Sequence, residues 1–194
     1  MKIRDSGMPE ESYWESLFDV PLVLSRLGTD QFHDVAELGC GYGTFTAPVA
    51  QVISGTLYTF DVDPDMIART RQRTAGLPVV CELRDVMELG FGVAVDAVLL
   101  FNILHCQRPV ELLRHAAQAL PRGGQVLATH WRHGETPRGP SLDIRPRPEQ
   151  IVQWACEAGL EAIGGVIELP PWHYGLRLRS FVKSETSGRR RGLR

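Results

Sequence analysis

Residues 35–43 read Val-Ala-Glu-Leu-Gly-Cys-Gly-Tyr-Gly. The first four, Val35–Leu38, are typical of a short buried strand of a parallel sheet. Three glycines follow at alternate positions: Gly39, Gly41 and Gly43. Because glycine has no Cβ, this segment can turn sharply and let its backbone approach a ligand closely. A helix that begins near Thr44 would then direct its first backbone N–H groups at the turn. The stretch therefore predicts a strand–turn–helix unit with a binding site at the turn.

An acidic residue, Asp61, ends the next apolar run of the chain. A carboxylate at this spacing accepts hydrogen bonds from ribose hydroxyls in dinucleotide-binding folds. The alternative for Asp61 is to cap the following helix, but Asp63, directly before Pro64, is better placed for that role. The glycines and Asp61 together predict a nucleoside-binding crevice.

The spacing of the glycines separates two kinds of nucleoside. Dinucleotide folds use G-x-G-x-x-G, with the helix N-terminus facing pyrophosphate. Here the pattern is G-x-G-x-G, and Thr44 occupies the place of the third glycine of that motif. Glu37 also precedes the first glycine by two residues. Its carboxylate would repel pyrophosphate and attract a cationic group, such as an ammonium or a sulfonium.

In these residues the chain resembles the class I S-adenosylmethionine-dependent methyltransferases, whose nucleoside motif is E/D-x-G-x-G-x-G. The resemblance runs from about Ser12 to Lys183 and is closest to small, standalone bacterial-type enzymes with unassigned substrates. It implies S-adenosylmethionine as the methyl donor and S-adenosylhomocysteine as the product. It also implies a seven-stranded sheet in the order 3-2-1-4-5-7-6, with strand seven antiparallel.

The resemblance assigns cofactor contacts along the chain. The turn under the methionine part is expected to comprise Gly39, Cys40, Gly41 and Gly43, and Glu37 is expected to contact the cofactor from the strand before it. Asp61 is expected to receive the ribose hydroxyls, and Val62 to pack against the adenine.

Two further positions are implied as cofactor contacts, each with a structural alternative. Asp85 would accept a hydrogen bond from the adenine amino group, with the backbone N–H of Val86 completing the recognition; the alternative is a loop or cap aspartate. Asn102 ends a predicted strand at the carboxyl edge, where open α/β sheets bind ligands. It would meet the amino acid part of the cofactor, or it simply stops a strand in a turn.

Strand-like and helix-like segments alternate, which predicts βαβ units and a mostly parallel Rossmann-like α/β sheet with helices on both faces. The predicted strands are Val35–Leu38, Thr56–Val62, Val79–Leu83, Val95–Phe101, Gln125–Trp131, Glu161–Leu169 and Leu176–Lys183. The predicted helices are Phe45–Ile53, Pro64–Ala75, Val110–Leu120 and Pro148–Ala158, with a helical segment at Glu10–Phe18. The last two strands are joined too briefly for a parallel crossover, so they should be antiparallel neighbours.

Length and composition fit one domain. The chain has 194 residues, of which 43% are hydrophobic, and a formal net charge of −2. We expect a single domain over residues 1–183, with residues 1–30 as an N-terminal helical cap segment. Residues 184–194 are rich in arginine and are expected to form a disordered basic tail.

The same features bear on partners and compartment. The slightly acidic balance gives no general attraction to nucleic acid. No apolar run approaches the roughly 20 residues that span a bilayer, and no secretory signal is evident. The four cysteines have no C-x-x-C spacing and are expected to be reduced thiols. We therefore expect a cytoplasmic protein with a small-molecule partner; its oligomeric state cannot be read from the sequence.

Methyl transfer from a sulfonium needs orientation, exclusion of water and, for some acceptors, a base. Candidate bases near strand ends or predicted loops are His105, His130, His173 and Tyr174. Candidate substrate contacts are Trp14, Trp131, Arg138, Arg145 and Trp172. The long irregular segment 136–148 is either a binding loop or a proline-stiffened connector. No metal site is expected, because the pair His130 and His133 would face one ligand only on a helix.

An absent motif narrows the acceptor. Family members that methylate base amines often carry N/D-P-P-Y/F after strand four, where this chain has Asn-Ile-Leu-His at 102–105. The departure and the acidic balance favour a small-molecule acceptor. Two alternatives stay open: a non-catalytic module that keeps the cofactor fold, and, disfavoured by Glu37 and Thr44, an NAD-linked oxidoreductase.

Overall fold

The computed structural model describes residues 9–181; the predicted basic tail at 184–194 lies outside them. The strands are β1 (Val35–Leu38), β2 (Leu57–Asp61), β3 (Val79–Leu83), β4 (Ala97–Phe101), β5 (Gln125–Trp131), β6 (Leu160–Ala162), β7 (Ile167–Leu169) and β8 (His173–Ser180). The helices are α1 (Glu11–Glu15), α2 (Val20–Leu27), α3 (Thr46–Val52), α4 (Pro64–Arg73), α5 (Val86–Leu89), α6 (Pro109–Ala119) and α7 (Pro148–Glu157), with a 3-10 turn at Thr29–Gln31.

All of these strands belong to one sheet, in the order β3-β2-β1-β4-β5-β8-β6, with β7 also paired to β8. The pairs from β3 through β5 are parallel, whereas β8 runs antiparallel to β5, β6 and β7. The predicted Rossmann-like α/β class is confirmed, and β8 takes the place of the antiparallel seventh strand.

The described sheet has eight strands where seven were expected, because the predicted strand Glu161–Leu169 is split. Gly164 interrupts it with a φ of 75°, a conformation that glycine adopts without steric cost. Both halves, β6 and β7, pair with the same strand, β8. That partner spans His173–Ser180, so it begins three residues before the predicted Leu176.

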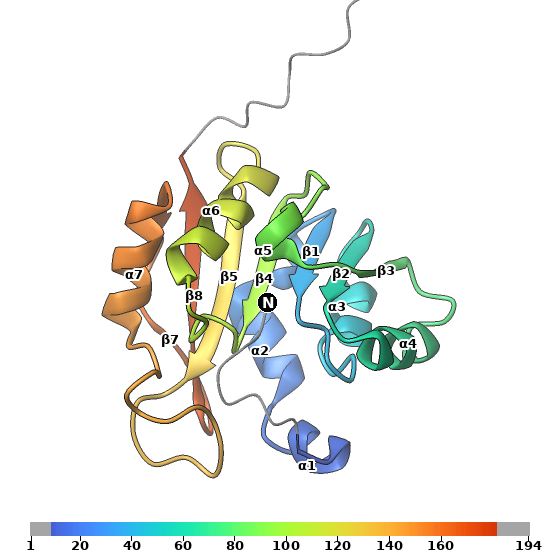
Figure 1. Ribbon diagram of the computed structural model, residues 1–194, viewed down its shortest axis with the longest axis horizontal. Helices are drawn as coiled ribbons and strands as arrows, with labels where there is room; N and C mark the ends of the chain where they lie inside the picture. The colour runs from blue at the N-terminus through green and yellow to red at the C-terminus, as the bar shows by residue number, and fades with distance from the viewer. Residues whose placement is uncertain (1–8, 182–194) are drawn as a thin grey trace, which may run out of the picture.

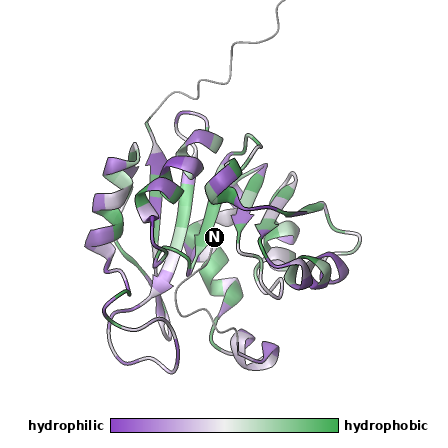
Figure 2. Ribbon diagram, viewed as in Figure 1, coloured by the Kyte–Doolittle hydropathy of each residue, from purple (hydrophilic) through white to green (hydrophobic). Residues whose placement is uncertain are grey.

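Helices cover both faces of the sheet (Figure 1). One apolar cluster joins α5, α6 and α7 to residues such as Leu38, Leu100 and Val126. The other joins α2 and α3 to the opposite face, through residues such as Leu57 and Leu99. The central strands are therefore buried on both sides and strongly apolar, while polar residues lie on the outer helices (Figure 2).

Local signals explain where the helices begin. Asp63 caps α4 by accepting hydrogen bonds from the backbone N–H groups of Asp65 and Met66, and Pro64 occupies the first turn. Helix α2 was not predicted as a separate element, although Asp19 caps it in the same way. The predicted N-terminal helical segment is shorter than expected, since α1 ends at Glu15.

The topology determines where a ligand can bind. Strand β1 lies between β2 and β4, so the chain order of the sheet reverses at β1 and β4. In open α/β sheets the crevice at the carboxyl ends of such strands is the usual binding site. None of the helices within residues 9–181 has the length and hydropathy needed to cross a membrane.

Candidate active site

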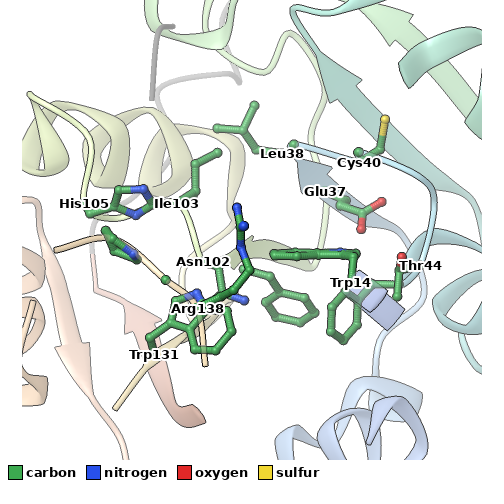
Figure 3. Close-up of a pocket in the computed structure, with 16 residues that line it drawn as sticks. Trp14, Glu37, Leu38, Cys40, Thr44, Asn102, Ile103, His105, Trp131 and Arg138 are labelled. Carbon is green, nitrogen blue, oxygen red and sulfur yellow. The ribbon is translucent and has the colours of Figure 1, made fainter. Parts of the chain in front are cut away.

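A pocket opens at the carboxyl ends of β1, β4 and β5, and Figure 3 shows its wall. Its void, including the part open to solvent, is about 920 Å³. The pocket is lined by Trp14, Glu37, Leu38, Gly39, Cys40, Gly41, Thr44, Phe45, Phe101, Asn102, Ile103, His105, Trp131, Arg138, Gly139 and Pro140.

The wall has two parts on opposite sides of the pocket. The glycine end comprises Glu37, residues 39–41 and Thr44, and the loop end comprises His105, Trp131 and residues 138–140. Figure 3 shows Glu37, Cys40 and Thr44 on one side of the pocket and His105 and Trp131 on the other. A single ligand or a pair of ligands could therefore touch both ends.

The glycine turn follows β1 and is fixed by its own backbone. Gly39, Gly41 and Gly43 have φ values of 80°, 51° and 76°, all in the left-handed region that favours glycine. The N–H of Gly39 donates to Phe60 O at 2.7 Å, and that of Gly43 to Cys40 O at 2.8 Å. A Cβ at Gly43 would lie 3.3 Å from Thr70 Oγ1. The predicted close turn is present, and Gly43 packs against α4 rather than lining the pocket.

Glu37 is a buried carboxyl group at the pocket wall, with a side chain that is 3% exposed. Its Oε2 accepts hydrogen bonds from Thr46 Oγ1 at 2.7 Å and Thr59 Oγ1 at 2.9 Å. Burial raises the pKa of Glu37 to about 7, against the smaller opposing effect of the two hydroxyls. A cation entering the glycine end would reverse this shift, because an opposite charge nearby favours the ionised carboxylate.

Asp61 lies beside the glycine end, at the carboxyl end of β2. Its Oδ2 accepts from the N–H of Gly41 at 3.1 Å, and its Oδ1 from the N–H of Asp63 at 3.0 Å. These bonds hold the carboxylate against the glycine turn and leave further lone pairs on both oxygens. The next residue, Val62, is 46% exposed, which leaves an apolar surface for a flat ligand.

Asp85 and Val86 follow β3, the edge strand next to β2. Asp85 caps α5 by accepting from the N–H of Met87 at 3.0 Å. Val86 is 1% exposed and belongs to the core, so only its backbone could meet a ligand. The cap alternative for Asp85 is therefore realised, and the cofactor contact stays a prediction.

Asn102 is the described non-glycine residue with positive φ, at 55°. Its side-chain Nδ2 and Oδ1 are both buried without a hydrogen-bond partner, as is Thr44 Oγ1. Buried polar groups without partners are costly, and backbone strain concentrates at functional sites. Since Asn102 and Thr44 both line the pocket, these orphaned groups point to a polar ligand there.

The loop end is closed by residues 132–147, which follow β5. A Cβ on Gly139 (φ 115°) would lie 2.9 Å from the Trp131 ring, so the loop backbone rests on that ring. Arg145 anchors the loop from beneath, donating to the carbonyls of Pro140, Arg132 and Gly134 and to Thr136 Oγ1. These hydrogen bonds hold the segment in place, and residues 138–140 line the pocket; ligand binding by the loop stays a prediction.

The four candidate bases do not gather in one place. His105 lines the pocket, and its Nδ1 lies 3.2 Å from Nε2 of His130, which is fully buried behind it. His173 stacks on Phe18 with ring centroids 4.6 Å apart, outside the pocket wall. Burial lowers its pKa to about 3. The Tyr174 hydroxyl donates to Pro146 O at 2.8 Å, and burial raises its pKa.

The candidate substrate contacts also divide. Trp14, Trp131 and Arg138 line the pocket. The guanidinium of Arg145 donates its hydrogen bonds to carbonyls of the loop. The guanidinium carbon of Arg132 lies 5.1 Å from the ring centroid of Trp172. Arg145, Trp172, His173 and Tyr174 do not line this pocket, and their catalytic or substrate-binding roles stay predictions.

A family model described as a methyltransferase domain matches residues 35–124, from β1 to the residue before β5. The expected resemblance to class I S-adenosylmethionine-dependent methyltransferases is confirmed. The match covers the glycine turn, Asp61, Asp85 and the end of β4. Over this part of the chain the sequence is therefore similar to a methyltransferase domain.

Solved structures agree with this family in fold. A SAM-dependent methyltransferase from Aquifex aeolicus matches with a TM-score of 0.76 at 20% identity, over 89% of this chain and 94% of that one. The N-methyltransferase NodS from Bradyrhizobium japonicum WM9 matches with a TM-score of 0.68 at 17% identity, over 89% of this chain and 99% of that one. Magnesium protoporphyrin IX methyltransferase (ChlM) from Synechocystis PCC 6803, with bound SAM, matches with a TM-score of 0.67 at 16% identity, over 90% of this chain and 86% of that one. No curated protein matches the sequence.

Sequence reasoning missed several residues of the pocket wall. Phe45 and Phe101 were predicted only as the ends of a helix and a strand, and Ile103 only as part of the segment 102–105. Gly139 and Pro140 were predicted only as parts of the irregular segment 136–148. The signal for Phe101 and Ile103 was their position beside Asn102 at a strand's carboxyl end. The signal for Gly139 was weaker, since its contact with Trp131 depends on the path of the loop.

Proposed function

We propose that this protein binds S-adenosylmethionine at the glycine end of the pocket and transfers its methyl group to a small-molecule acceptor at the loop end. The observation that carries the proposal is the continuity of one pocket between the two ends. In-line methyl transfer requires donor and acceptor to meet in one enclosed space.

The amino acid part of the donor would occupy the glycine end. Glu37 carries a buried carboxyl group that a cationic ammonium would ionise, and the turn at 39–41 lets the backbone approach. Asn102 has an amide without partners beside this position. A carboxylate or ammonium of the ligand would satisfy it and recover the cost of its desolvation.

The adenosine part would run across the carboxyl ends of β2 and β3. Asp61 retains acceptor capacity for two ribose hydroxyls, and Val62 offers an exposed apolar side chain to adenine. Asp85 and the backbone N–H of Val86 would recognise the adenine edge. Cys40 would contribute its backbone rather than its thiol, since burial raises the pKa of that thiol and keeps it protonated.

The acceptor would lie against Trp131 and Arg138. Aromatic rings of Trp14, Phe45 and Phe101 line the same pocket, so a flat apolar acceptor has extensive surface to contact. Arg138 adds a cationic group, which favours an acceptor with a negative or electron-rich substituent. Small-molecule use is in keeping with the neighbour named for magnesium protoporphyrin IX.

The nicotinamide alternative is disfavoured by the position of Glu37, because a carboxyl group at the turn opposes pyrophosphate. Titration calorimetry with S-adenosylhomocysteine, S-adenosylmethionine and NADH separates the two functions. We expect one site for each of the first two ligands and no heat from NADH. No binding of S-adenosylhomocysteine at millimolar concentration would refute the proposal. Binding without methyl transfer to any of a broad acceptor panel would favour a non-catalytic module.

A further inference from the structure

The middle of the pocket, between the glycine end and the loop end, is lined largely by aromatic side chains. Its residues are Trp14, Leu38, Phe45, Phe101, Asn102 and Ile103. The three aromatic residues come from separate elements: Trp14 lies in α1, Phe45 directly before α3, and Phe101 at the end of β4. Together they form what we term the aromatic wall.

Edge-to-face contacts hold the aromatic wall in place. Phe18 does not line the pocket, but its ring centroid lies 4.9 Å from that of Trp14 and 5.1 Å from that of Phe45. The centroids of Phe45 and Phe101 are 4.9 Å apart, again in an edge-to-face arrangement. Because these contacts position the rings before a ligand binds, binding requires little further ordering of the side chains.

The middle of the pocket offers a cation no opposite charge. Within residues 9–181, the charged residues of the lining are Glu37 and Arg138, which lie at the glycine end and the loop end. A cation that leaves water is strongly destabilised unless the protein compensates it. The face of an aromatic ring carries a partial negative charge and attracts a cation within about 6 Å of the ring centroid. The aromatic wall therefore provides the compensation that this part of the pocket can supply.

The proposed function would bring one cationic atom to this place. The amino acid part of S-adenosylmethionine would occupy the glycine end and the acceptor would occupy the loop end, so the sulfonium and its methyl group must lie between them. In Figure 3, Trp14 and Asn102 lie between Thr44 and His105. The sulfonium would therefore border the aromatic wall. Since the acceptor must reach the methyl group there, the same rings can contact both ligands.

We propose that the aromatic wall binds the sulfonium of the donor through cation–π contacts and so makes the site select S-adenosylmethionine over S-adenosylhomocysteine. This inference rests on the proposed function. In the transfer, the acceptor's lone pair forms the bond to the methyl carbon, and the electron pair of the broken carbon–sulfur bond stays on sulfur. The thioether that results is neutral and loses its attraction to the rings. The aromatic wall thus retains the charged donor and releases the neutral product.

The strength of cation–π contacts gives the size of the preference. In an enclosed site, a cation over an aromatic face gains about 5- to 30-fold in affinity. We therefore expect S-adenosylmethionine to bind about 5- to 30-fold more tightly than S-adenosylhomocysteine. Tryptophan is the most effective of the aromatic side chains in such contacts, so Trp14 should contribute the largest share.

Calorimetry on the full-length protein tests the preference with three ligands that share the adenosine and amino acid parts. They are S-adenosylmethionine, S-adenosylhomocysteine and sinefungin, in which a carbon that bears an ammonium group replaces the methylated sulfur. Ratios of their dissociation constants cancel the contacts that the ligands share. We expect both cationic ligands to bind more tightly than S-adenosylhomocysteine. If sinefungin bound only as tightly as S-adenosylhomocysteine, the preference would belong to the methyl group and the proposal would be overturned.

Variants of the wall show whether the rings cause the preference. Trp14→Leu removes the ring, so the ratio of the dissociation constants of S-adenosylhomocysteine and S-adenosylmethionine should fall at least about threefold toward 1. Trp14→Phe keeps a ring and should retain most of the preference. Phe18→Leu is the matched control, because Phe18 packs against the aromatic wall without lining the pocket; its ratio should equal that of the wild-type protein. An unchanged ratio in Trp14→Leu, or an equal fall in Phe18→Leu, would contradict the proposal.

The same titrations distinguish this inference from the proposed function. If neither S-adenosylmethionine nor S-adenosylhomocysteine bound at millimolar concentration, the proposed function would be refuted, and this inference with it. If both bound to the wild-type protein with equal affinity, the proposed function would stand and only the preference for the sulfonium would be refuted.

Discussion

The two ends of the pocket are built from different kinds of sequence information. The glycine end comes from one short stretch, residues 37–44, in which each residue follows its neighbours out of β1. The loop end is assembled from His105, Trp131 and residues 138–140, which meet only because β4 and β5 are adjacent and the loop folds back. A site formed by one contiguous motif can therefore be predicted from a single sequence, whereas a site formed by distant segments depends on the tertiary structure that brings them together.

The contrast predicts that changes at or beside the glycine end reduce donor binding most strongly. Asp61→Ala removes an ionised acceptor that would bind two ribose hydroxyls, and hydrogen bonds to charged groups are each worth about 1.5–3 kcal/mol. We expect S-adenosylhomocysteine affinity to fall by about 100-fold or more, measured by calorimetry. Asp65→Asn, an exposed carboxylate in the first turn of α4, is the control and should bind like wild type. If Asp61→Ala bound S-adenosylhomocysteine as tightly as the wild-type protein does, Asp61 would not be a cofactor contact.

Glu37 should make the folding stability depend on pH, and the same side chain should contribute to donor binding. Its pKa is raised from 4.5 to about 7 in the folded protein, so its stabilising effect is complete below pH 4.5 and is lost as pH rises through about 7. The change over this window is about 3 kcal/mol, at 1.36 kcal/mol per pKa unit. The glutamine in Glu37→Gln does not titrate. As pH rises through this window, we therefore expect the free energy of unfolding of the variant to increase by this amount relative to that of the wild-type protein.

Urea unfolding of both proteins at several pH values measures that difference. The same Glu37→Gln protein should bind S-adenosylmethionine more weakly, because the amide cannot neutralise an ammonium group. A constant stability difference across pH would show that Glu37 is not buried in an uncharged form. Tighter binding by the variant would contradict its role in the site.

A change beneath the loop end should affect the loop and spare donor binding. Arg145→Lys keeps the charge but loses the guanidinium fork that reaches three carbonyls. We expect a loss of about 2 kcal/mol in folding stability and faster proteolysis within residues 132–147. Arg147→Lys, at an exposed position of the same loop, is the control. Wild-type proteolysis in Arg145→Lys would mean that the loop is held by other contacts.

The smallest effect is expected at the ion pairs between α1 and α4. Arg73 contacts Glu11 and Glu15 near the surface, and exposed pairs of this kind contribute less than about 1 kcal/mol. Arg73→Gln should leave the melting temperature nearly unchanged and shift Trp14 fluorescence slightly, since α1 carries Trp14 into the pocket. A large drop in stability would indicate that α1 is more firmly attached than these contacts suggest.

The features that could be predicted from the sequence follow the same division between the glycine end and the loop end. The glycine turn, the parallel strands and their carboxyl-edge site could be inferred from glycine spacing, apolar runs and Asp61, because these signals are local. The split of Glu161–Leu169 at Gly164 was missed, since a continuous β-like pattern does not reveal a change of conformation at one glycine. Helix α5 was missed because it has four residues, too few for a periodic signal.

Side-chain roles were harder to predict than positions. His105, His130, His173 and Tyr174 all lie near the expected edge, yet only His105 reaches the pocket wall. Alternation along β5 and β8 sends neighbouring side chains to opposite faces, so His130 and Trp131 meet different partners. Arg145 looked like an anion ligand because its donors suit one, but loop carbonyls occupy them. Such competition between partners is decided by tertiary packing.

The most direct test of the two-ended pocket is a crystal structure with S-adenosylhomocysteine bound. We predict the ribose hydroxyls on Asp61, the amino group near Glu37, and the thioether sulfur facing the loop end, within reach of an acceptor held between Trp131 and His105. Density for the ligand elsewhere, or a bound orientation that turns the sulfur away from His105 and Trp131, would contradict the account.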